Sequence, residues 1–397
     1  MPSDAQCIFH PLRVPDWRLY MEEFELIVPT LFGMESFVSR ELKRLGYETT
    51  AVEDGRVTFR GGYDAICRAN LWLRTGERVL IKAGEFTALS FEELFEKTKA
   101  IDWSRLISKN AAFPVKGYCL KSQLASMRDC QAIIKKAVAD SLSASYGIDW
   151  LPEDEETYQI QFSVMKDRVT LMIDTSGDGL HKRGYRRIAN AAPLKETIAA
   201  AMIMLSYWKF EYPLADPFCG SGTIPIEAAM FKRNIAPGLT RNFAFQEFKF
   251  IPQSAFAEAK EEAMSLKRNT PLEIYASDID SEAIETAAQN ARLAGVADAV
   301  RPTLARAEDF CSETRYGSVI CNPPYGERLG SLEECESLYR AIGKTFSKLP
   351  DWSYYIIASS ENFEKLFGRQ ADKRRKIYNG MIKCNIYQYF GKRPPKN

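Results

Sequence analysis

Short apolar runs and helically spaced apolar residues alternate along most of this sequence. In its first part, "FELIVPT" (24–30) is a run typical of a strand, and the segment "GMESFVSRELKRLGY" after it has apolar residues at helical spacing. Asp54-Gly55 lies between two strand-like runs, which favours a hairpin turn. These signals predict a small α+β unit over residues 24–64.

A second α/β unit is predicted over residues 65–178. "SFEELFEKTKAI" begins with Ser90, an expected helix cap, and has Glu93 three residues later. "RDCQAIIKKAVADSLSASYG" has apolar residues on roughly one helix face, and "YQIQFSVMKDRVTLMIDTSG" is typical of two strands around a tight turn. The glycine-rich, basic segment "DTSGDGLHKRGYRR" (174–187) marks the boundary that follows.

From residue 179 to 397 the pattern changes to strands that alternate with helices. "YPLADPF", "LEIYASDI" and "GSVICNPP" are strand-like, and each precedes a helical segment. This alternation predicts an α/β domain with a mostly parallel sheet covered by helices. Asn379-Gly380, between two later strand-like arms, predicts an antiparallel hairpin at the sheet edge. Residues 1–23 contain three prolines and are expected to form a tail.

Composition narrows the function classes. The net charge is +1, so nucleic-acid binding would depend on local basic patches. The nine cysteines include no C-x-x-C pair, which argues against a zinc site or a disulfide framework and favours the cytoplasm. The two histidines, His10 and His181, argue further against metal sites and hydrolytic triads. No apolar run reaches the length of a membrane span, and we expect no secretory signal.

A glycine turn is the first feature that points to chemistry. "LADPFCGSGT" places Asp216 at a strand end, Gly220 and Gly222 in the turn, and a helix start after them. Such turns cradle adenosine cofactors at the carboxyl edge of a parallel sheet. The string is neither a P-loop nor G-x-G-x-x-G. Asp216 would repel a pyrophosphate but suits the amino group of a methionine-derived cofactor.

A second acidic strand end follows in "YASDID". Asp278 can bind ribose hydroxyls there, although it lies 56 residues (278 − 222) after Gly222, where about 20 is usual. An insertion that begins "NIAPGLTRNFAFQEFKFIP" accounts for the longer gap. The alternative is purely structural: the glycines make a tight turn and Asp278 caps the next helix.

The third strand end carries "NPPYGER". The side-chain oxygen of Asn322 and the carbonyl of Pro323 are acceptors that could hold both hydrogens of an exocyclic amine. Pro323 and Pro324 contribute no N–H to compete for these acceptors, and Tyr325 offers a flat face for a base. We therefore expect Asn322 to point at the methyl group of a bound donor. The alternative is a Pro-Pro turn that ends a strand.

As a set, these motifs resemble those of a known family. "DPFCGSGT", "ASDID" and "NPPYGERLG" are similar to motifs of class I S-adenosylmethionine-dependent N-methyltransferases. "DTSGDGLHKRGYR", "APLKETIAAAM" and "NIAPG" add a closer resemblance to RNA methyltransferases with a THUMP domain, of the large-subunit ribosomal RNA guanine-N2 type. The resemblance implies a Rossmann-like catalytic domain, S-adenosylmethionine as cofactor, and a ferredoxin-like piece followed by an RNA-binding THUMP domain.

The resemblance also implies roles for individual residues. The expected target-base site is Asn322, Pro323, Pro324 and Tyr325. The expected cofactor contacts are Asp216, Phe218, Gly220, Gly222, Asp278, Asn322 and, in the helix that leads into the sheet, Glu196 and Thr197. Such enzymes often place an acid after the next strand to meet the adenine amine. Here the string is "LARAEDF", where Arg306 aligns best and Glu308 or Asp309 could substitute.

Two basic clusters are candidate RNA contacts. The first is "HKRGYRR", with Lys182, Arg183, Tyr185, Arg186 and Arg187; the second is "DKRRK" (372–376). Cations there could neutralise phosphates, and Tyr185 could stack on a base. The alternative is a solvated linker or helix face.

The sequence thus favours an enzyme that methylates an exocyclic amine of an RNA base, with guanine N2 of large-subunit ribosomal RNA as the first hypothesis. Adenine-N6 methylation of DNA or RNA is an alternative. A non-catalytic RNA-binding or ribosome assembly factor is an alternative of another class. The oligomeric state stays open.

Overall fold

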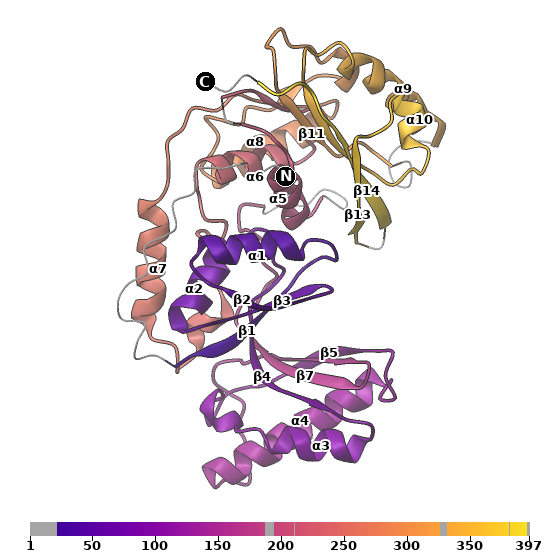
Figure 1. The fold of residues 1–397 in the computed structure, drawn as a ribbon. Helices are drawn as coiled ribbons and strands as arrows, with labels where there is room; N and C mark the ends of the chain where they lie inside the picture. The colour runs from indigo at the N-terminus through magenta and orange to yellow at the C-terminus, as the bar shows by residue number, and fades with distance from the viewer. Residues whose placement is uncertain (1–21, 187–193, 210, 326–331, 381, 395–397) are drawn as a thin grey trace.

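The computed structural model describes residues 22–186, 194–209, 211–325, 332–380 and 382–394. Nearly all of the expected tail, together with Arg187, Glu327 and Arg328, lies outside these residues. The described chain forms two seven-stranded sheets, the first in the lower half of the molecule as drawn in Figure 1 and the second in the upper half. None of its helices is long and apolar enough to cross a membrane.

The first sheet is built from residues 24–174 in the order β2-β3-β1-β4-β7-β6-β5. Both hairpins expected in this region are present, around Asp54-Gly55 and Lys166-Asp167. Its strands are β1 (Phe24–Pro29), β2 (Thr49–Glu53), β3 (Arg56–Gly61), β4 (Leu80–Thr87), β5 (Val115–Leu120), β6 (Ile160–Met165) and β7 (Arg168–Asp174). Its helices are α1 (Glu35–Arg44), α2 (Tyr63–Trp72), α3 (Phe91–Lys99) and α4 (Met127–Tyr146). Ser90 caps α3 by accepting the Glu93 N–H, as expected.

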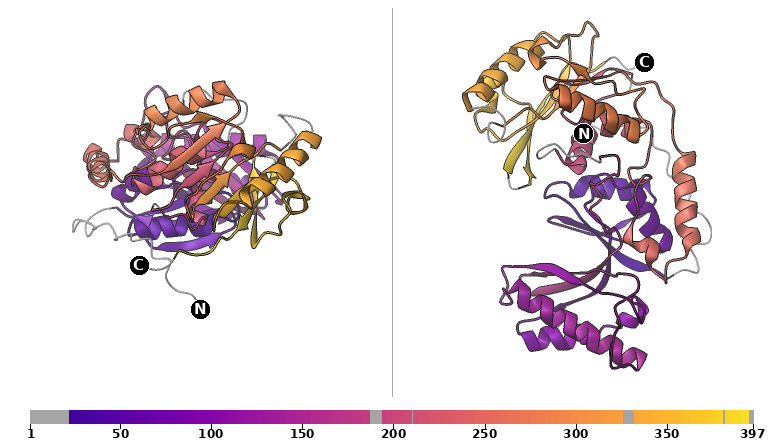
Figure 2. Two further views of the ribbon diagram at one scale, coloured as in Figure 1. Left: turned by 90° about the horizontal axis from the view of Figure 1, so that it is seen from above. Right: turned by 180° about the vertical axis from the view of Figure 1, so that it is seen from behind.

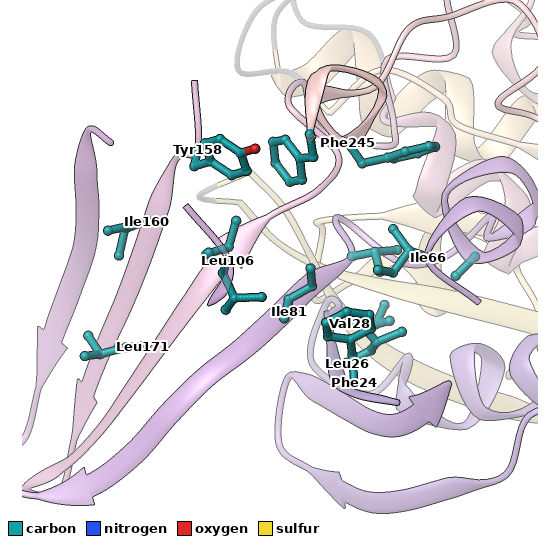
Figure 3. Packing of buried hydrophobic residues seen from close by; sticks show 14 of the residues in the cluster. Phe24, Leu26, Val28, Ile66, Ile81, Leu106, Tyr158, Ile160, Leu171 and Phe245 are labelled. Atoms are coloured by element: carbon teal, nitrogen blue, oxygen red, sulfur yellow. The ribbon is translucent and has the colours of Figure 1, made fainter. Parts of the chain in front are cut away.

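Strand β4 belongs to both of the expected N-terminal units. It pairs with β1 through Leu80 and Ile81, and it pairs with β7 along its length. The buried core is continuous as well: Leu26 of β1 belongs to the same cluster as Leu171 of β7 (Figure 3). The boundary expected near residue 64 therefore separates two parts of one sheet.

The second sheet has the order β10-β9-β8-β11-β12-β14-β13, with parallel pairing from β10 to β12. The predicted hairpin at Asn379-Gly380 joins β13 and β14 at the edge. Its strands are β8 (Leu214–Asp216), β9 (Ile274–Asp278), β10 (Thr303–Leu304), β11 (Ser318–Cys321), β12 (Ser353–Ala358), β13 (Lys373–Asn379) and β14 (Ile382–Tyr389). The prediction of a mostly parallel α/β sheet is confirmed.

Helices cover both faces of the second sheet. Successive residues of a strand point to opposite faces. Accordingly, Ile320 lies in the core cluster beneath α5, α6 and α8, whereas Val319 and Cys321 lie in the cluster beneath α9 and α10. These helices are α5 (Glu196–Leu205), α6 (Thr223–Lys232), α8 (Ser281–Leu293), α9 (Leu332–Phe346) and α10 (Phe363–Phe367).

The insertion between α6 and β9 leaves the second sheet and packs on the first region. Its helix α7 (Gln253–Ser265) runs alongside α2, with Arg68 and Glu262 paired at 2.8 and 3.0 Å (Figures 1 and 2). Phe248 stacks on Tyr158, with ring centroids 4.3 Å apart. The sequence predicted an insertion here but not this attachment, which joins the two halves of the molecule.

Candidate active site at the carboxyl edge of the second sheet

Three neighbouring parallel strands end at one edge of the second sheet. β9, β8 and β11 are adjacent, and they end at Asp278, Asp216 and Cys321, just before Asn322. The three motifs identified in the sequence are therefore brought to one edge. Open α/β sheets bind ligands at this edge.

The glycine turn after β8 is fixed to the end of β9. The Gly220 N–H donates to Asp278 Oδ2 at 2.8 Å, and the Cys219 N–H donates to the Ser277 carbonyl at 2.9 Å. Gly220 and Gly222 have φ angles of +50° and +83°, in the left-handed region that favours glycine. Asp278 thus holds the turn in place.

The two glycines differ in their surroundings. A Cβ added at Gly220 would meet no heavy atom of the described residues within 4 Å, whereas one at Gly222 would come within 3.1 Å of Ala287 and Ile226. Among the described residues Gly220 therefore borders open space through which a ligand can reach the main chain, which is what a cofactor cradle requires. Gly222 instead permits close packing of α6 against α8.

Asp216 lies beneath the turn. It is 1% exposed, and its Oδ1 accepts the Phe218 N–H at 3.1 Å. Burial raises the pKa of Asp216 well above its ordinary value, the Phe218 hydrogen bond opposes this shift, and the charge of Asp278 adds to it. A cation beside Asp216 would stabilise the charged form of this buried carboxylate.

A side chain that the sequence analysis missed supports the same turn. Asn290, buried in α8, donates from Nδ2 to the Ser221 carbonyl at 2.9 Å. A polar amide on the apolar face of a helix was the available signal, because buried polar groups need a partner.

Asn322 already has a hydrogen-bond partner. The Tyr325 hydroxyl donates to Asn322 Oδ1, and the Tyr339 hydroxyl of α9 donates to the Pro324 carbonyl at 2.7 Å. The Tyr325 ring is partly buried against the second-sheet core, and burial raises the pKa of its hydroxyl. No motif in the sequence pointed to Tyr339.

Most of the first basic cluster is structural. Arg183 is 2% exposed; it pairs with Glu227 of α6 at 3.2 Å and donates to the Arg74 carbonyl at 2.6 Å. Tyr185 is 1% exposed, and its hydroxyl donates to Glu227 at 3.4 Å. The expectation that Arg183 and Tyr185 contact RNA is therefore wrong, because a buried carboxylate and the domain junction hold them. Lys182 is exposed and pairs only with Asp178 in the described residues.

Arg186 faces the glycine turn and not the outer surface. It pairs with Glu196 at 3.3 Å and donates to the hydroxyl of Thr223, the first residue of α6. Arg186 thus links Glu196 to the start of α6, and burial raises the pKa of Glu196 against the opposing charge of Arg186. Glu196 as a cofactor contact stays a prediction. Thr197 instead donates to Glu77 of the N-terminal region at 2.9 Å, so its hydroxyl is used at the junction between the two regions.

The residues considered for the adenine contact follow β10. Leu304 of β10 pairs with Asp278, and Arg306 and Glu308 follow, joined by an ion pair of 2.9 Å. Arg306 is exposed, and the Glu308 side chain is 26% exposed. Glu308 as a cofactor contact stays a prediction.

Comparison with known proteins identifies the family. Residues 183–388, more than half of the chain, match the family model described as "RMKL-like, methyltransferase domain". This chain belongs to the RMKL-like methyltransferases. Two further models match before it, the RlmL ferredoxin-like domain over residues 25–80 and the THUMP domain over residues 88–174.

Several relatives cover nearly the whole chain. "Putative RNA methyltransferase YpsC" of Bacillus subtilis is 44% identical over 95% of this chain and 98% of its own length. A "possible methylase" from Clostridium difficile 630 is 47% identical, with a TM-score of 0.91 over 95% of this chain and all of the other. SMU.472, a "putative methyltransferase complexed with SAH", is 40% identical, with a TM-score of 0.89 over 95% of this chain and all of the other.

The resemblance to THUMP-containing, S-adenosylmethionine-dependent methyltransferases is thereby confirmed. Within the described residues, no group of three or more His, Cys, Asp and Glu side chains could hold a metal ion. The cytoplasmic location inferred from the cysteines stays a prediction.

Proposed function

We propose that this RMKL-like methyltransferase transfers a methyl group from S-adenosylmethionine to an exocyclic amine of an RNA base. The first candidate for this amine is N2 of a guanine in large-subunit ribosomal RNA. The observation that carries the proposal is that Asn322-Pro323 directly follows β11, the neighbour of the strand β8 that leads into the glycine turn. S-adenosylmethionine supplies an electrophilic methyl group when it is bound.

Several residues of this chain are proposed to bind the cofactor. Gly220 leaves room for the cofactor at the main chain, and Asp278 both clamps the turn and has free lone pairs for ribose hydroxyls. Asp216 and Phe218 hold the turn from below. Burial raises the pKa of Asp216, so a cation beside it would stabilise its charged form, which suits the amino group of the cofactor. Glu196 already pairs with Arg186.

Asn322 Oδ1 and the Pro323 carbonyl are proposed to accept the two amine hydrogens, which directs the nitrogen lone pair at the methyl group. The positive charge that develops on nitrogen strengthens both hydrogen bonds in the transition state. Pro324 contributes indirectly, because Tyr339 holds its carbonyl.

Tyr325 has to change partners before it can act as a stacking platform. Its hydroxyl donates to the oxygen that the amine needs, and its ring is partly buried. We propose that an incoming base displaces this hydroxyl, so that one hydrogen bond to Asn322 replaces another. The acceptor is then never left buried and unpaired, a state that costs about 1–3 kcal/mol.

RNA is proposed as the substrate because of the THUMP match and because YpsC is named an RNA methyltransferase. The acceptor pair fits both adenine N6 and guanine N2, since each is an exocyclic amine. Methylation of ribosomal RNA and of duplex DNA with labelled S-adenosylmethionine distinguishes the substrates. Label only in DNA would overturn the RNA proposal, and N6-methyladenosine in digested RNA would replace guanine N2 by adenine N6.

The Asn322→Ala variant tests the catalytic role. Removal of one preorganised transition-state acceptor is expected to reduce kcat by about 100- to 1,000-fold, with cofactor affinity changed far less. Methyl transfer is measured with tritiated cofactor, and cofactor affinity by calorimetry. Asn242→Ala, an exposed amide in the insertion, is the matched control. Unchanged kcat in Asn322→Ala would contradict the mechanism, and absence of methyl transfer by the wild-type chain would favour a non-catalytic RNA-binding factor.

A further inference from the structure

A cavity lies at the amino ends of the parallel strands of the second sheet, on the side away from the candidate active site. It has a volume of about 280 Å³, and its wall includes Ser318 and Ser353, the first residues of β11 and β12. Asn322 follows the last residue of β11 at the other edge. A six-residue strand such as β12 spans about 20 Å, so this cavity is separate from the active site.

Five aromatic residues line the cavity: Tyr207, the buried Trp208, Tyr212, Tyr316 and Phe390. Tyr207 is 51% exposed, and its ring meets Phe390 edge-on with centroids 5.3 Å apart. Tyr212 and Tyr316 form a second edge-on pair at 5.5 Å. Half-exposed aromatic rings in a cavity are a surface on which a flat ligand can stack.

Four cations surround the same rings: Lys209, Lys373, Lys392 and Arg393. Arg393 lies 5.7 Å from the Tyr207 ring, and Lys373 lies 5.9 Å from the Phe390 ring. Lys209, Lys373 and Arg393 have no ion pair within the described residues. Lys392 makes one long contact, 3.8 Å, to Asp351.

The nearby acids are used by other arginines. Asp351 pairs with Arg315 at 2.8 Å, and Asp372 accepts from Arg369 at 3.1 Å and from the Phe390 N–H at 2.7 Å. Together with the unpaired cations, this leaves an excess of positive charge at the cavity. Such a site favours an anion joined to a flat ring.

We propose that this cavity binds an unpaired nucleotide of RNA, with its base on Tyr207 and its phosphates near Lys209 and Arg393. Stacking on an aromatic ring with cations along the backbone is how proteins hold single-stranded nucleic acid without sequence preference. The inference rests on RNA as the substrate class but assigns a contact outside the active site. The RNA strand that supplies the target base would thus also be bound at this cavity, at the amino ends of the β-strands.

The first test is photo-crosslinking of a single-stranded RNA 12-mer that contains 4-thiouridine to the full-length chain. We expect crosslinked peptides that contain Tyr207 or Phe390 and their loss in Tyr207→Ala. Crosslinks in the N-terminal region are expected to persist in that variant. Absence of any crosslink at the cavity would overturn the proposal, and because no methyl transfer is measured, this result is independent of the catalytic mechanism.

The second test is fluorescence anisotropy with the same RNA at several salt concentrations. Tyr207→Ala is expected to weaken binding by about 5-fold or more. Lys209→Ala with Arg393→Ala should reduce the slope of log K against log salt by about 1.4, at about 0.7 for each phosphate contact of a single strand. Lys260→Ala, on the exposed face of α7, is the charge control.

Melting temperatures within the spread of the wild type would show that these variants fold. Equal affinity and equal salt slope in all variants would contradict the proposal. So would concentration-dependent self-association of the wild type that Tyr207→Ala abolishes without an effect on RNA, because the cavity would then bind a second copy of the chain.

Discussion

Gly220 and Gly222 differ by two positions and have different reasons to be glycine. Both have positive φ, but of the two only Gly222 has close contacts among the described residues, with Ala287 and Ile226. A side chain at Gly222 would strain the fold, whereas a side chain at Gly220 would enter the space proposed for the cofactor.

Alanine substitutions separate these reasons. Gly222→Ala is expected to lower the free energy of unfolding by roughly 2 kcal/mol or more, from the left-handed backbone and the close contacts together. Gly220→Ala should cost only about 1–2 kcal/mol but weaken S-adenosylmethionine binding at least 10-fold. Urea unfolding and calorimetric titration measure the two effects. Equal cofactor affinity in Gly220→Ala and wild type would show that the open space is not the cradle.

Asp216 gives a pH-dependent prediction. Because burial raises its pKa above the ordinary 3.8, the folded state retains a proton that the unfolded state releases. The stability from this proton is complete below pH 3.8 and is lost as the pH rises through the folded-state pKa. Asp216→Asn keeps the acceptor for Phe218 and has no charge to bury, so its Tm should exceed that of the wild type at pH 8.

The advantage should be roughly 2 °C for each kcal/mol and should shrink towards pH 4. Differential scanning calorimetry at both pH values measures it, with Asp149→Asn, an exposed acid, as control. A Tm difference that is the same at both pH values would contradict the assignment. The same variant should bind S-adenosylmethionine more weakly, because the cofactor's amino group would lose its anion.

Residue identity was enough to predict the turn but not the basic cluster. Asp216 and Asp278 end recognisable strands, and Gly220 and Gly222 lie in the turn after the first of them. Their common edge could therefore be predicted from the alternation of strands and helices. Arg183 looked like an exposed cation because its partner, Glu227, lies 44 residues away on α6. Burial of a charge by a distant carboxylate leaves no local pattern in a sequence.

At the scale of elements, local signals predicted hairpins and helix starts correctly. Asn379-Gly380 and Ser90 act through neighbouring backbone groups, so a short string contains the information. Two arrangements depend on distant partners and were not predicted. One is the use of β4 by two units, and the other is the packing of α7 on α2.

The whole molecule is held together by contacts that bridge its two sheets. Besides α7, the junction contains Arg183, which donates to the Leu73 and Arg74 carbonyls while it pairs with Glu227. Glu77 pairs there with His181 and Lys195. Phe37 of α1 lies 4.9 Å from Arg375 of β13.

Replacement of Arg183, the cation at the centre of this junction, should lower the stability of the protein. Arg183→Ala removes the ion-pair partner of the buried Glu227 and leaves it the Tyr185 hydrogen bond, which is expected to cost about 3–5 kcal/mol and to lower the Tm clearly. RNA affinity per folded molecule should be unchanged at a temperature below the transition. Thermal unfolding and anisotropy measure the two quantities.

Lys182→Ala, one residue earlier, provides the contrast. Its side chain is 60% exposed, so stability should change by no more than about 0.5 kcal/mol. If Arg183→Ala were as stable as Lys182→Ala and lost RNA affinity, the structural role assigned to Arg183 would be wrong.

The continuous N-terminal sheet fixes the distance between the THUMP region and the candidate active site. The ferredoxin-like and THUMP regions share β4, so no flexible linker separates them, and bending between them would break paired backbone hydrogen bonds. The ferredoxin-like region is in turn fixed to the catalytic domain through α7 and Arg183. An RNA bound by the THUMP region would therefore present to Asn322 only nucleotides at a fixed distance from the bound segment. Target selection would then depend on this distance before any hydrogen bond to the base forms.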